Sequence, residues 1–221
     1  REPGFEEKET IATGTEAAAR GGFTAVCCMP NTSPPIDSPD AMTHLKSKIG
    51  SAARVRVFPI GCVSQGRRGE RLTDMARLAE SGVVGFSDDG SPVADSELMQ
   101  RALERSRLLD LPVMDHCEDL ALTAGGVMNE GSSAAELHLK GMPAAAEERV
   151  IQRDIDLAML TGARIHITHV STAGSVEIVR RGRETGVRVT AEATPHHLTL
   201  TDESVRMCGT DAKVNPPLRT A

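Results

Sequence analysis

The sequence predicts an α/β protein with a parallel sheet, because strand-like runs alternate with segments of helical spacing. Short apolar runs rich in β-branched residues recur along the chain and form the expected strands. They are Phe23–Cys28, Val55–Cys62, Val83–Phe86, Leu111–Met114, Arg164–His169 and Arg188–Ala191. Two architectures fit this alternation, a doubly wound open sheet and a (β/α)8 barrel.

The expected helices lie between these runs and have recognisable start and stop signals. They are Glu9–Arg20, Pro39–Lys48, Arg71–Glu80, Ser96–Leu109, Glu147–Leu160 and Ala173–Glu184. Asp95 or Ser96 is placed to cap one helix start, and Ser171 or Thr172 another. Glycines such as Gly82 and Gly162 directly follow several of the helical segments and predict where they end.

One interval between strands is much longer than the others. It contains the segment Leu120–Ala146, which is rich in Gly, Ala and Ser and follows the fourth apolar run. We interpret it as an insertion loop, and long loops of this kind are often functional.

Composition excludes several classes of protein. The 221 residues are 39% hydrophobic and 25% charged, as is typical of a globular domain that can bury a core. A formal net charge of −6, with no compensating basic stripe, argues against nucleic acid as the partner. No apolar run is long enough to span a membrane. The five cysteines lack paired spacing, which favours the reducing cytoplasm.

Polar residues at the carboxyl ends of the strands indicate the chemistry, because ligands bind at that edge in both architectures. The run Val83–Phe86 is followed by Asp89, and the run that begins at Leu111 is followed by His116. The run that begins at Arg164 ends at His169. A carboxylate and two imidazoles are the ligands expected for Zn²⁺ or a similar divalent ion.

The remaining histidines are weaker candidates. His44 is expected on a helix surface, and His138 lies in the insertion. His166 and His169 are three residues apart on a strand, so at most one of them faces the site. His196 and His197 follow the last strand, where packing or an indirect role is the expected one.

Seven short motifs follow one another along essentially the whole chain. They are Arg1-Glu2-Pro3-Gly4, Met29-Pro30-Asn31-Thr32, Phe86-Ser87-Asp88-Asp89-Gly90, His116-Cys117-Glu118-Asp119, His169-Val170-Ser171-Thr172, Pro195-His196-His197-Leu198 and Asn215-Pro216-Pro217-Leu218-Arg219. These motifs, in this order, resemble those of class I dihydroorotases.

The resemblance implies a distorted (β/α)8 barrel with a binuclear metal centre that interconverts N-carbamoyl-L-aspartate and dihydroorotate in pyrimidine synthesis. By motif matching, Asp89 resembles the carboxylate that bridges the metals, and His116 and His169 resemble imidazole ligands. Arg1 and Asn31 resemble the groups that hold the substrate carboxylate, as an Arg fork and an amide donor can do. Asn215 resembles a further substrate contact.

Two family motifs are absent from the chain. A His-x-His pair is expected immediately before Arg1, and an acid/base aspartate in a Thr-Asp-His-Ala-Pro-like motif is expected beyond Ala221. The six strands would then be the second to seventh of the barrel. We therefore expect a fragment of a longer enzyme, inactive by itself.

Three alternatives stay open. A dihydropyrimidinase or allantoinase would share the layout, but those enzymes generally carry a lysine at the position of Asp89. A dihydroorotase-like chain without catalytic activity could be a structural partner of aspartate transcarbamoylase, whereas the enzyme itself could also be a homo-oligomer. The third alternative is an α/β binding module whose histidines have no catalytic role.

Overall fold

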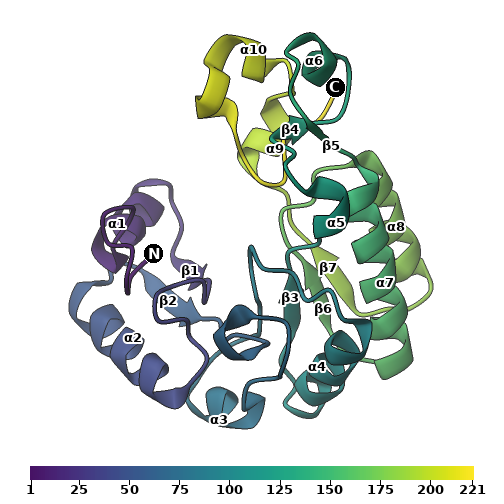
Figure 1. Ribbon diagram of the computed structural model, residues 1–221. Coiled ribbons are helices and arrows are strands. Elements are labelled where there is room, and N and C mark those ends of the chain that lie inside the picture. Colours follow the sequence, from purple (N-terminus) through teal and green to yellow (C-terminus); the bar gives the residue numbers. More distant parts are fainter. The chain divides into compact units, whose positions relative to one another are not determined.

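A computed structural model describes all 221 residues, which divide into two compact units. Unit 1 comprises Arg1–Met114 and unit 2 comprises Asp115–Ala221. The helices and strands of each unit are labelled in Figure 1. The helices fall short of the combined length and apolar character that a bilayer-spanning segment requires.

Unit 1 alternates helices with parallel strands, as its sequence predicts. Its elements are α1 (Ile11–Arg20), β1 (Ala25–Cys28), α2 (Pro39–Ala52), β2 (Arg56–Pro59), the 3-10 turn η1 (Gln65–Arg67), α3 (Met75–Glu80), α4 (Ser96–Leu108) and the start of β3 (Val113–Asp115). β1 and β2 pair in parallel, with Ala25 opposite Arg56. The third helix begins at Met75, later than predicted, because the basic segment that precedes it belongs to η1 and the following bend.

The predicted strand Val83–Phe86 does not form a continuous strand, and it joins the sheet through isolated β-bridges at Phe86. Phe86 bridges Gly61 on one side and Val113 on the other, both in the parallel sense. The amide of Val84 also donates to the carbonyl of Pro59. The sheet of unit 1 therefore follows chain order, from β1 through β2 and this segment to β3, without the reversal of a doubly wound sheet.

Unit 2 repeats the alternation and adds several short elements. They are α5 (Leu120–Thr123), β4 (Met128–Asn129), α6 (Ser132–Glu136), β5 (Gly141–Met142), α7 (Ala145–Thr161), β6 (Ile165–Ile167), α8 (Ala173–Glu184), β7 (Val189–Ala191), α9 (Pro195–Thr199), α10 (Ser204–Cys208) and the 3-10 turn η2 (Gly209–Ala212). β6 pairs in parallel with β7. The amide of Thr168, just past β6, donates to the carbonyl of Asp115 at the end of β3.

The expected insertion loop Leu120–Ala146 is not without structure. It contains α5, α6 and a two-stranded parallel ribbon of β4 and β5, in which Met128 lies opposite Gly141. These elements have two to five residues each, too few for a helical or strand period to be recognised in the sequence.

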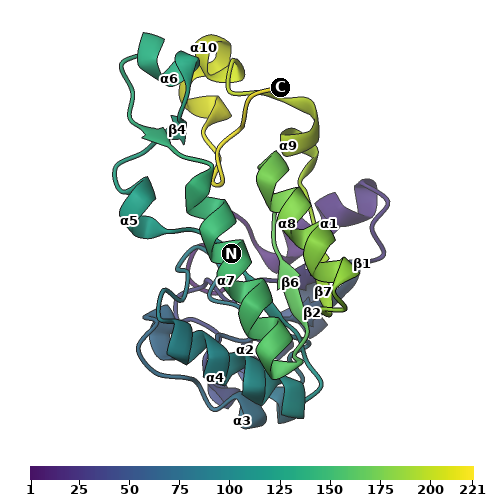
Figure 2. The same ribbon diagram turned by 90° about the vertical axis from the view of Figure 1, so that its right-hand side faces the viewer.

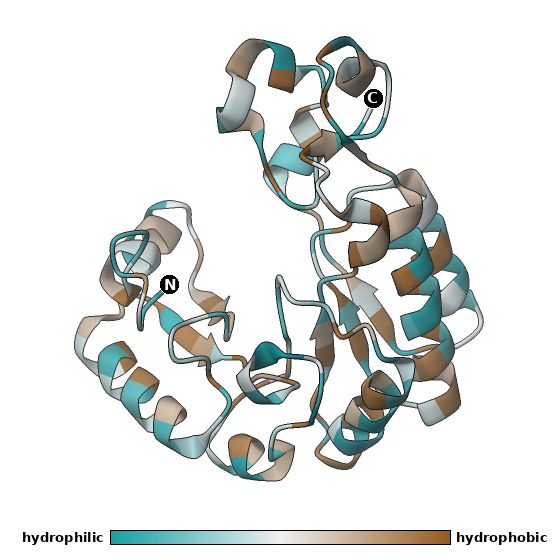
Figure 3. Ribbon diagram, viewed as in Figure 1, coloured by the Kyte–Doolittle hydropathy of each residue, from teal (hydrophilic) through white to brown (hydrophobic).

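The core of each unit consists of the apolar residues that the pattern predicts. In unit 1, Ile60, Phe86 and Met99 are fully buried, and in unit 2 Ile151 and Ile167 are. Figure 3 shows hydrophobic residues along β6 and a mixture of hydrophobic and hydrophilic turns on α4 and α7, as expected for helices with one buried face.

Helices α7 and α8 lie side by side against β6 and β7, as Figures 1 and 2 both show. Their close approach depends on Gly182, because a Cβ at that position would lie 3.0 Å from Ile155 of α7. Thr172 caps α8, since its side chain accepts from the amide of Ser175, and Gly162 ends α7 in the left-handed conformation. Both signals were readable in the sequence.

Candidate metal and substrate site

The two adjacent aspartates of unit 1, Asp88 and Asp89, have different hydrogen-bond partners. Asp88 is 2% exposed, and its carboxylate accepts from the amides of Val63 at 2.9 Å and Ser64 at 3.1 Å, and from the Ser64 hydroxyl. Burial raises the pKa of Asp88, and these hydrogen bonds oppose the rise. The side chain of Asp88 therefore holds the backbone of the segment that follows β2.

Asp89 is half-buried, and its side chain has a different partner. Its Oδ2 accepts from the amide nitrogen of Asn31 at 2.6 Å. Its backbone carbonyl accepts from the guanidinium of Arg67, which also donates to the hydroxyl of Ser91 at 3.1 Å. The backbone of the Asp89 turn is thus tied to η1.

Arg1, Asn31 and Asp89 line the same cavity of unit 1. This cavity has a volume of about 350 Å³ and includes Thr10 and Thr32 in its wall. The structure therefore brings together, within unit 1, all the sequence-predicted site residues that this unit contains. A cation, an amide and a carboxylate around one cavity can recognise a small polar molecule.

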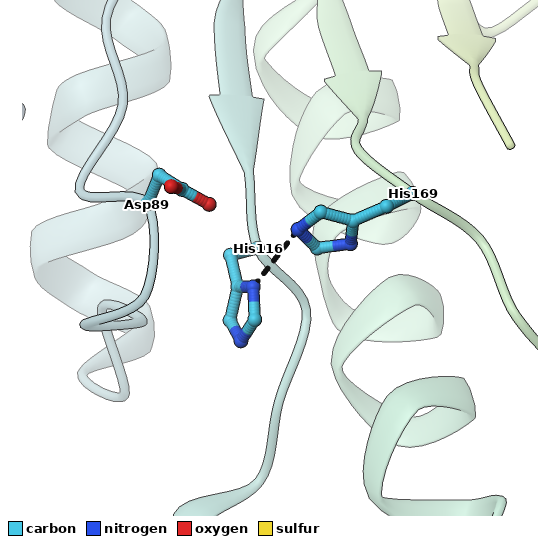
Figure 4. A group of neighbouring side chains, drawn as sticks. All are labelled: Asp89, His116 and His169. Carbon is cyan, nitrogen blue, oxygen red and sulfur yellow. Dashed lines mark hydrogen bonds between the residues drawn. The ribbon is translucent and has the colours of Figure 1, made fainter. Parts of the chain in front are cut away.

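Unit 2 brings together the two predicted histidines. His116 follows β3 and is 3% exposed, and His169 follows β6. His116 Nδ1 lies 3.0 Å from His169 Nε2, and the dashed line between the rings in Figure 4 marks this hydrogen bond. His169 has a φ of 35°, a left-handed conformation that is uncommon for a side chain of this size and recurs at functional sites.

Glu118 is a site residue whose role the sequence reasoning missed. Its Oε2 accepts from His116 Nε2 at 2.8 Å and from Asn215 Nδ2 at 3.0 Å, and its Oε1 accepts from the Thr123 hydroxyl at 2.6 Å. The hydrogen bond from His116 is the main reason that the pKa of Glu118 is lowered to about 2. The signal in the sequence was its place in the His116-Cys117-Glu118-Asp119 motif, where only the histidine was assigned a role.

Asn215 lies beside Glu118 within unit 2. Its amide nitrogen donates to Glu118, and it lines a small recess of unit 2 that also includes His116 and Arg219. The predicted contact between Asn215 and substrate stays a prediction.

A second buried group lies directly beside His116 in the sequence. Asp115, Cys117 and Asp154 offer ligand atoms within 4.8 Å of one another, all of them buried. Arg153 donates to Asp154 at 2.7 Å and lies 3.8 Å from Asp115, so the group already contains its own cation. Burial, followed by the nearby Asp154 carboxylate, raises the pKa of Asp115 well above its usual value. We interpret this group as the anchor of β3 on α7.

The other histidines have structural partners or lie on the surface. His166 is 2.8 Å from the Thr190 hydroxyl of β7, and His197 bonds to Thr194 at 2.7 Å and to the carbonyl of Pro216 at 3.0 Å. His44 is exposed, as predicted. The expectation of a packing or indirect role for His197 agrees with its contacts.

Arg219 connects the insertion to the end of the chain. Its guanidinium donates to the Asn129 side chain at 3.0 Å, to the carbonyl of Met142 at 2.8 Å and to the Ser171 hydroxyl at 3.1 Å. Asn129 in turn donates to Asp202 at 3.1 Å. The ribbon of β4 and β5 is therefore attached on both strands to the segment that carries Asn215.

The fold and the histidine pair together define the class of protein. Parallel strands in chain order with acidic and histidine side chains at their carboxyl ends have the arrangement in which (β/α) barrels place their ligand sites. The chain superimposes on the L-hydantoinase (dihydropyrimidinase) from Arthrobacter aurescens with a TM-score of 0.80 at 25% identity, covering 96% of this chain and 48% of that one. It superimposes on the dihydropyrimidinase from Brevibacillus agri with a TM-score of 0.74 at 24% identity, which shows the α/β fold alone.

Sequence comparison identifies the family within this class. The model of the family described as dihydro-orotase-like matches residues 1–175, and the chain belongs to this family. It is 56% identical over 221 residues to the dihydroorotase of Pelotomaculum thermopropionicum and 55% identical to that of Geobacter sp. strain M21. It covers 52% of each, so it spans about half the length of these relatives. The resemblance to dihydroorotases found in the sequence is confirmed.

Proposed function

We propose that the complete protein to which this chain belongs is a dihydroorotase that interconverts N-carbamoyl-L-aspartate and dihydroorotate in pyrimidine biosynthesis. The observation that carries the proposal is the identity of 50–56% with dihydroorotases along the whole chain. In the hydantoinase comparison, which points to the related cyclic amidohydrolases, the identity is 25%. The reaction closes or opens a cyclic amide C–N bond.

The proposed metal ligands of this chain are Asp89, His116 and His169. The pair of ring nitrogens supports this assignment, because two imidazole nitrogens 3.0 Å apart are close enough to bind one metal ion once the proton shared between them is lost. Two nitrogens and a carboxylate oxygen suit Zn²⁺, and further ligands would complete a site for one or two ions. A divalent metal ion bound there would supply Lewis-acid activation of water and of the reacting carbonyl.

The proposed substrate contacts are Arg1, Asn31 and Asn215. Arg1 and Asn31 line one cavity, where a guanidinium fork and an amide N–H can hold the carboxylate that N-carbamoyl-L-aspartate and dihydroorotate share. Asn31 also donates to Asp89, so the group that holds the substrate would be positioned by a proposed metal ligand.

We assign residues 1–221 to strands two to seven of a (β/α)8 barrel, with the insertion at about 120–146. The support is the order of strands, which follows the chain in each unit. The His-x-His pair and the acid/base aspartate are expected on the first and last strands, outside this chain. For that reason the 221-residue chain alone is proposed not to turn over substrate, and a cytoplasmic location stays an expectation.

Two alternatives make different predictions. A dihydropyrimidinase or allantoinase would use the bridging lysine that is typical of those enzymes, whereas this chain has Asp89 in the corresponding motif. A structural partner of aspartate transcarbamoylase would lack the His-x-His pair in the complete protein and would bind the transcarbamoylase instead of turning over substrate. A complete protein that forms oligomers when purified alone would favour a homo-oligomer over an assembly with the transcarbamoylase.

The test is an assay of the complete protein for formation of dihydroorotate from N-carbamoyl-L-aspartate, with metal content measured on the same sample. Cyclisation that is lost when Asp89 is changed to Ala, together with loss of bound metal, is the expected result. A metal-containing protein that opens dihydrouracil or allantoin but not dihydroorotate would refute the proposal. A protein without bound metal or activity that copurifies with aspartate transcarbamoylase would favour the structural partner.

A further inference from the structure

The two nitrogens of the His116 ring face different partners. Nε2 lies 2.8 Å from the Glu118 carboxylate, and Nδ1 lies 3.0 Å from Nε2 of His169. A neutral imidazole carries its proton on one nitrogen and a lone pair on the other, so the partner of one nitrogen decides the role of the other.

The hydrogen bonds around Glu118 indicate which nitrogen carries the proton. Both carboxylate oxygens already accept, since Oε1 accepts from the Thr123 hydroxyl and Oε2 accepts from Asn215 Nδ2. Glu118 therefore meets His116 as an acceptor, and Nε2 of His116 is the donor. The lone pair then lies on Nδ1, the nitrogen on the side of His169.

The position of Glu118 is itself fixed by segments far apart in the chain. Thr123 is the last residue of α5, whose N-terminus is capped by the Asp119 side chain at 3.1 Å from the amide of Ala121. Asn215 comes from the segment near the end of the chain, 97 residues after Glu118. The side chain of Glu118 is 11% exposed, so water competes little for these bonds.

We infer that Glu118 is a positioning residue that fixes the tautomer and the ring orientation of His116, and that Thr123 and Asn215 hold Glu118 in place. The inference rests on the proposed function, because it assigns Nδ1 of His116 as the atom offered to the metal. It gives α5, the first element of the insertion, a defined task, which is to supply the hydroxyl that orients Glu118.

The expected effect of losing Glu118 is a weaker metal site rather than a lost fold. Without the acceptor, the His116 ring can rotate or place its proton on Nδ1, and either change removes the lone pair from the metal side. Removal of such a second partner of a metal-binding histidine typically weakens metal affinity by about 10–100-fold. Arg1 and Asn31 belong to unit 1 and are not changed, whereas Asn215 loses its acceptor, so kcat is expected to fall by a larger factor than KM rises.

The experiment measures the zinc affinity of the complete protein by competition with a chromophoric chelator, alongside kcat and KM. The variants are Glu118→Ala, Glu118→Gln and Thr123→Val, with the exposed insertion residue Glu130→Ala as the matched control. Glu118→Gln keeps an acceptor oxygen toward His116 and Asn215 and turns its NH₂ toward the Thr123 hydroxyl, which can accept. We expect Glu118→Ala to weaken zinc binding by about 10–100-fold, Glu118→Gln by less than about tenfold, and Glu130→Ala not at all.

Thr123→Val keeps the side-chain volume and should weaken zinc binding by a smaller factor than Glu118→Ala. The metal-free variants should unfold at nearly the same temperature as the metal-free wild type. Zinc affinity of Glu118→Ala within twofold of the wild type overturns the inference, as does Glu118→Gln weakened as much as Glu118→Ala. Failure of the proposed function looks different, because the wild type would then bind zinc without forming dihydroorotate, or would not bind it.

Discussion

The adjacent carboxylates Asp88 and Asp89 are expected to respond in opposite ways to the same substitution. Asp88→Asn keeps one acceptor oxygen for the amide of Val63 but places an NH₂ group against the amide and hydroxyl of Ser64. The variant loses the hydrogen bonds of Ser64 to the charged acceptor Oδ2, worth about 1.5–3 kcal/mol, while the Ser64 amide keeps its bond to Oδ1 at 3.2 Å. Relief of the buried charge offsets part of this, since burial raises the pKa of Asp88. The expected loss of stability is about 1–3 kcal/mol.

Asp89→Asn should leave stability within about 1 kcal/mol, because the residue is half-buried and the amide oxygen still accepts from Asn31. Its effect is expected on zinc affinity and activity, with a loss of at least about tenfold.

The assay is urea denaturation of the metal-free complete protein, followed by zinc titration of the folded variants. The reasoning predicts a crossed pattern, with stability lost at Asp88 and metal affinity lost at Asp89. If Asp88→Asn unfolds at the same urea concentration as the wild type, or if Asp89→Asn is the less stable variant, the assignment of the two carboxylates is wrong.

Three further predictions follow from contacts elsewhere in the chain. Glu2 accepts from the amide of Ile11, the main reason its pKa is lowered, and it pairs with Lys48 at 3.1 Å. Because the pKa of Glu2 is lower in the folded state, its ionised carboxylate stabilises the fold above the ordinary pKa of 4.5, and this stabilisation is lost as the pH falls below that value. Glu2→Gln should therefore cost about 1 kcal/mol of stability at pH 7 and progressively less below pH 4.5. A stability difference between wild type and variant that widens in acid would contradict this. Arg219→Met should selectively speed amide hydrogen exchange in residues 128–142, because Arg219 loses two hydrogen bonds to that region and one to Ser171. Unchanged exchange would show that Arg219 does not stabilise the ribbon of β4 and β5. Removal of bound metal with a chelator should abolish activity and lower the Tm of the complete protein, both restored by Zn²⁺, whereas activity that survives chelation would exclude the proposed metal chemistry.

The helices of the main alternation were readable from the sequence because their signals are local. Side-chain caps and left-handed glycines act within a few residues, so Thr172 and Gly162 marked the limits of α8 and α7 correctly. The short elements α5, α6, α9 and α10 were missed because four or five residues do not contain a full amphipathic period. The run Val83–Phe86 was read correctly as part of the sheet, although it pairs only through single bridges.

The sequence by itself determined the α/β alternation, the family and the residue types at the strand ends, because these depend on local pattern and motif. Only the tertiary structure decided which of those side chains meet. Asp88 turns to the backbone of residues 63 and 64, and the two histidines, 53 positions apart, face each other. Glu118 accepts a hydrogen bond from Asn215, a partner 97 residues away that no local pattern indicates. The physical reason is that a hydrogen bond requires a specific distance and direction, and for residues far apart in the chain these are set by the packing of helices and strands between them.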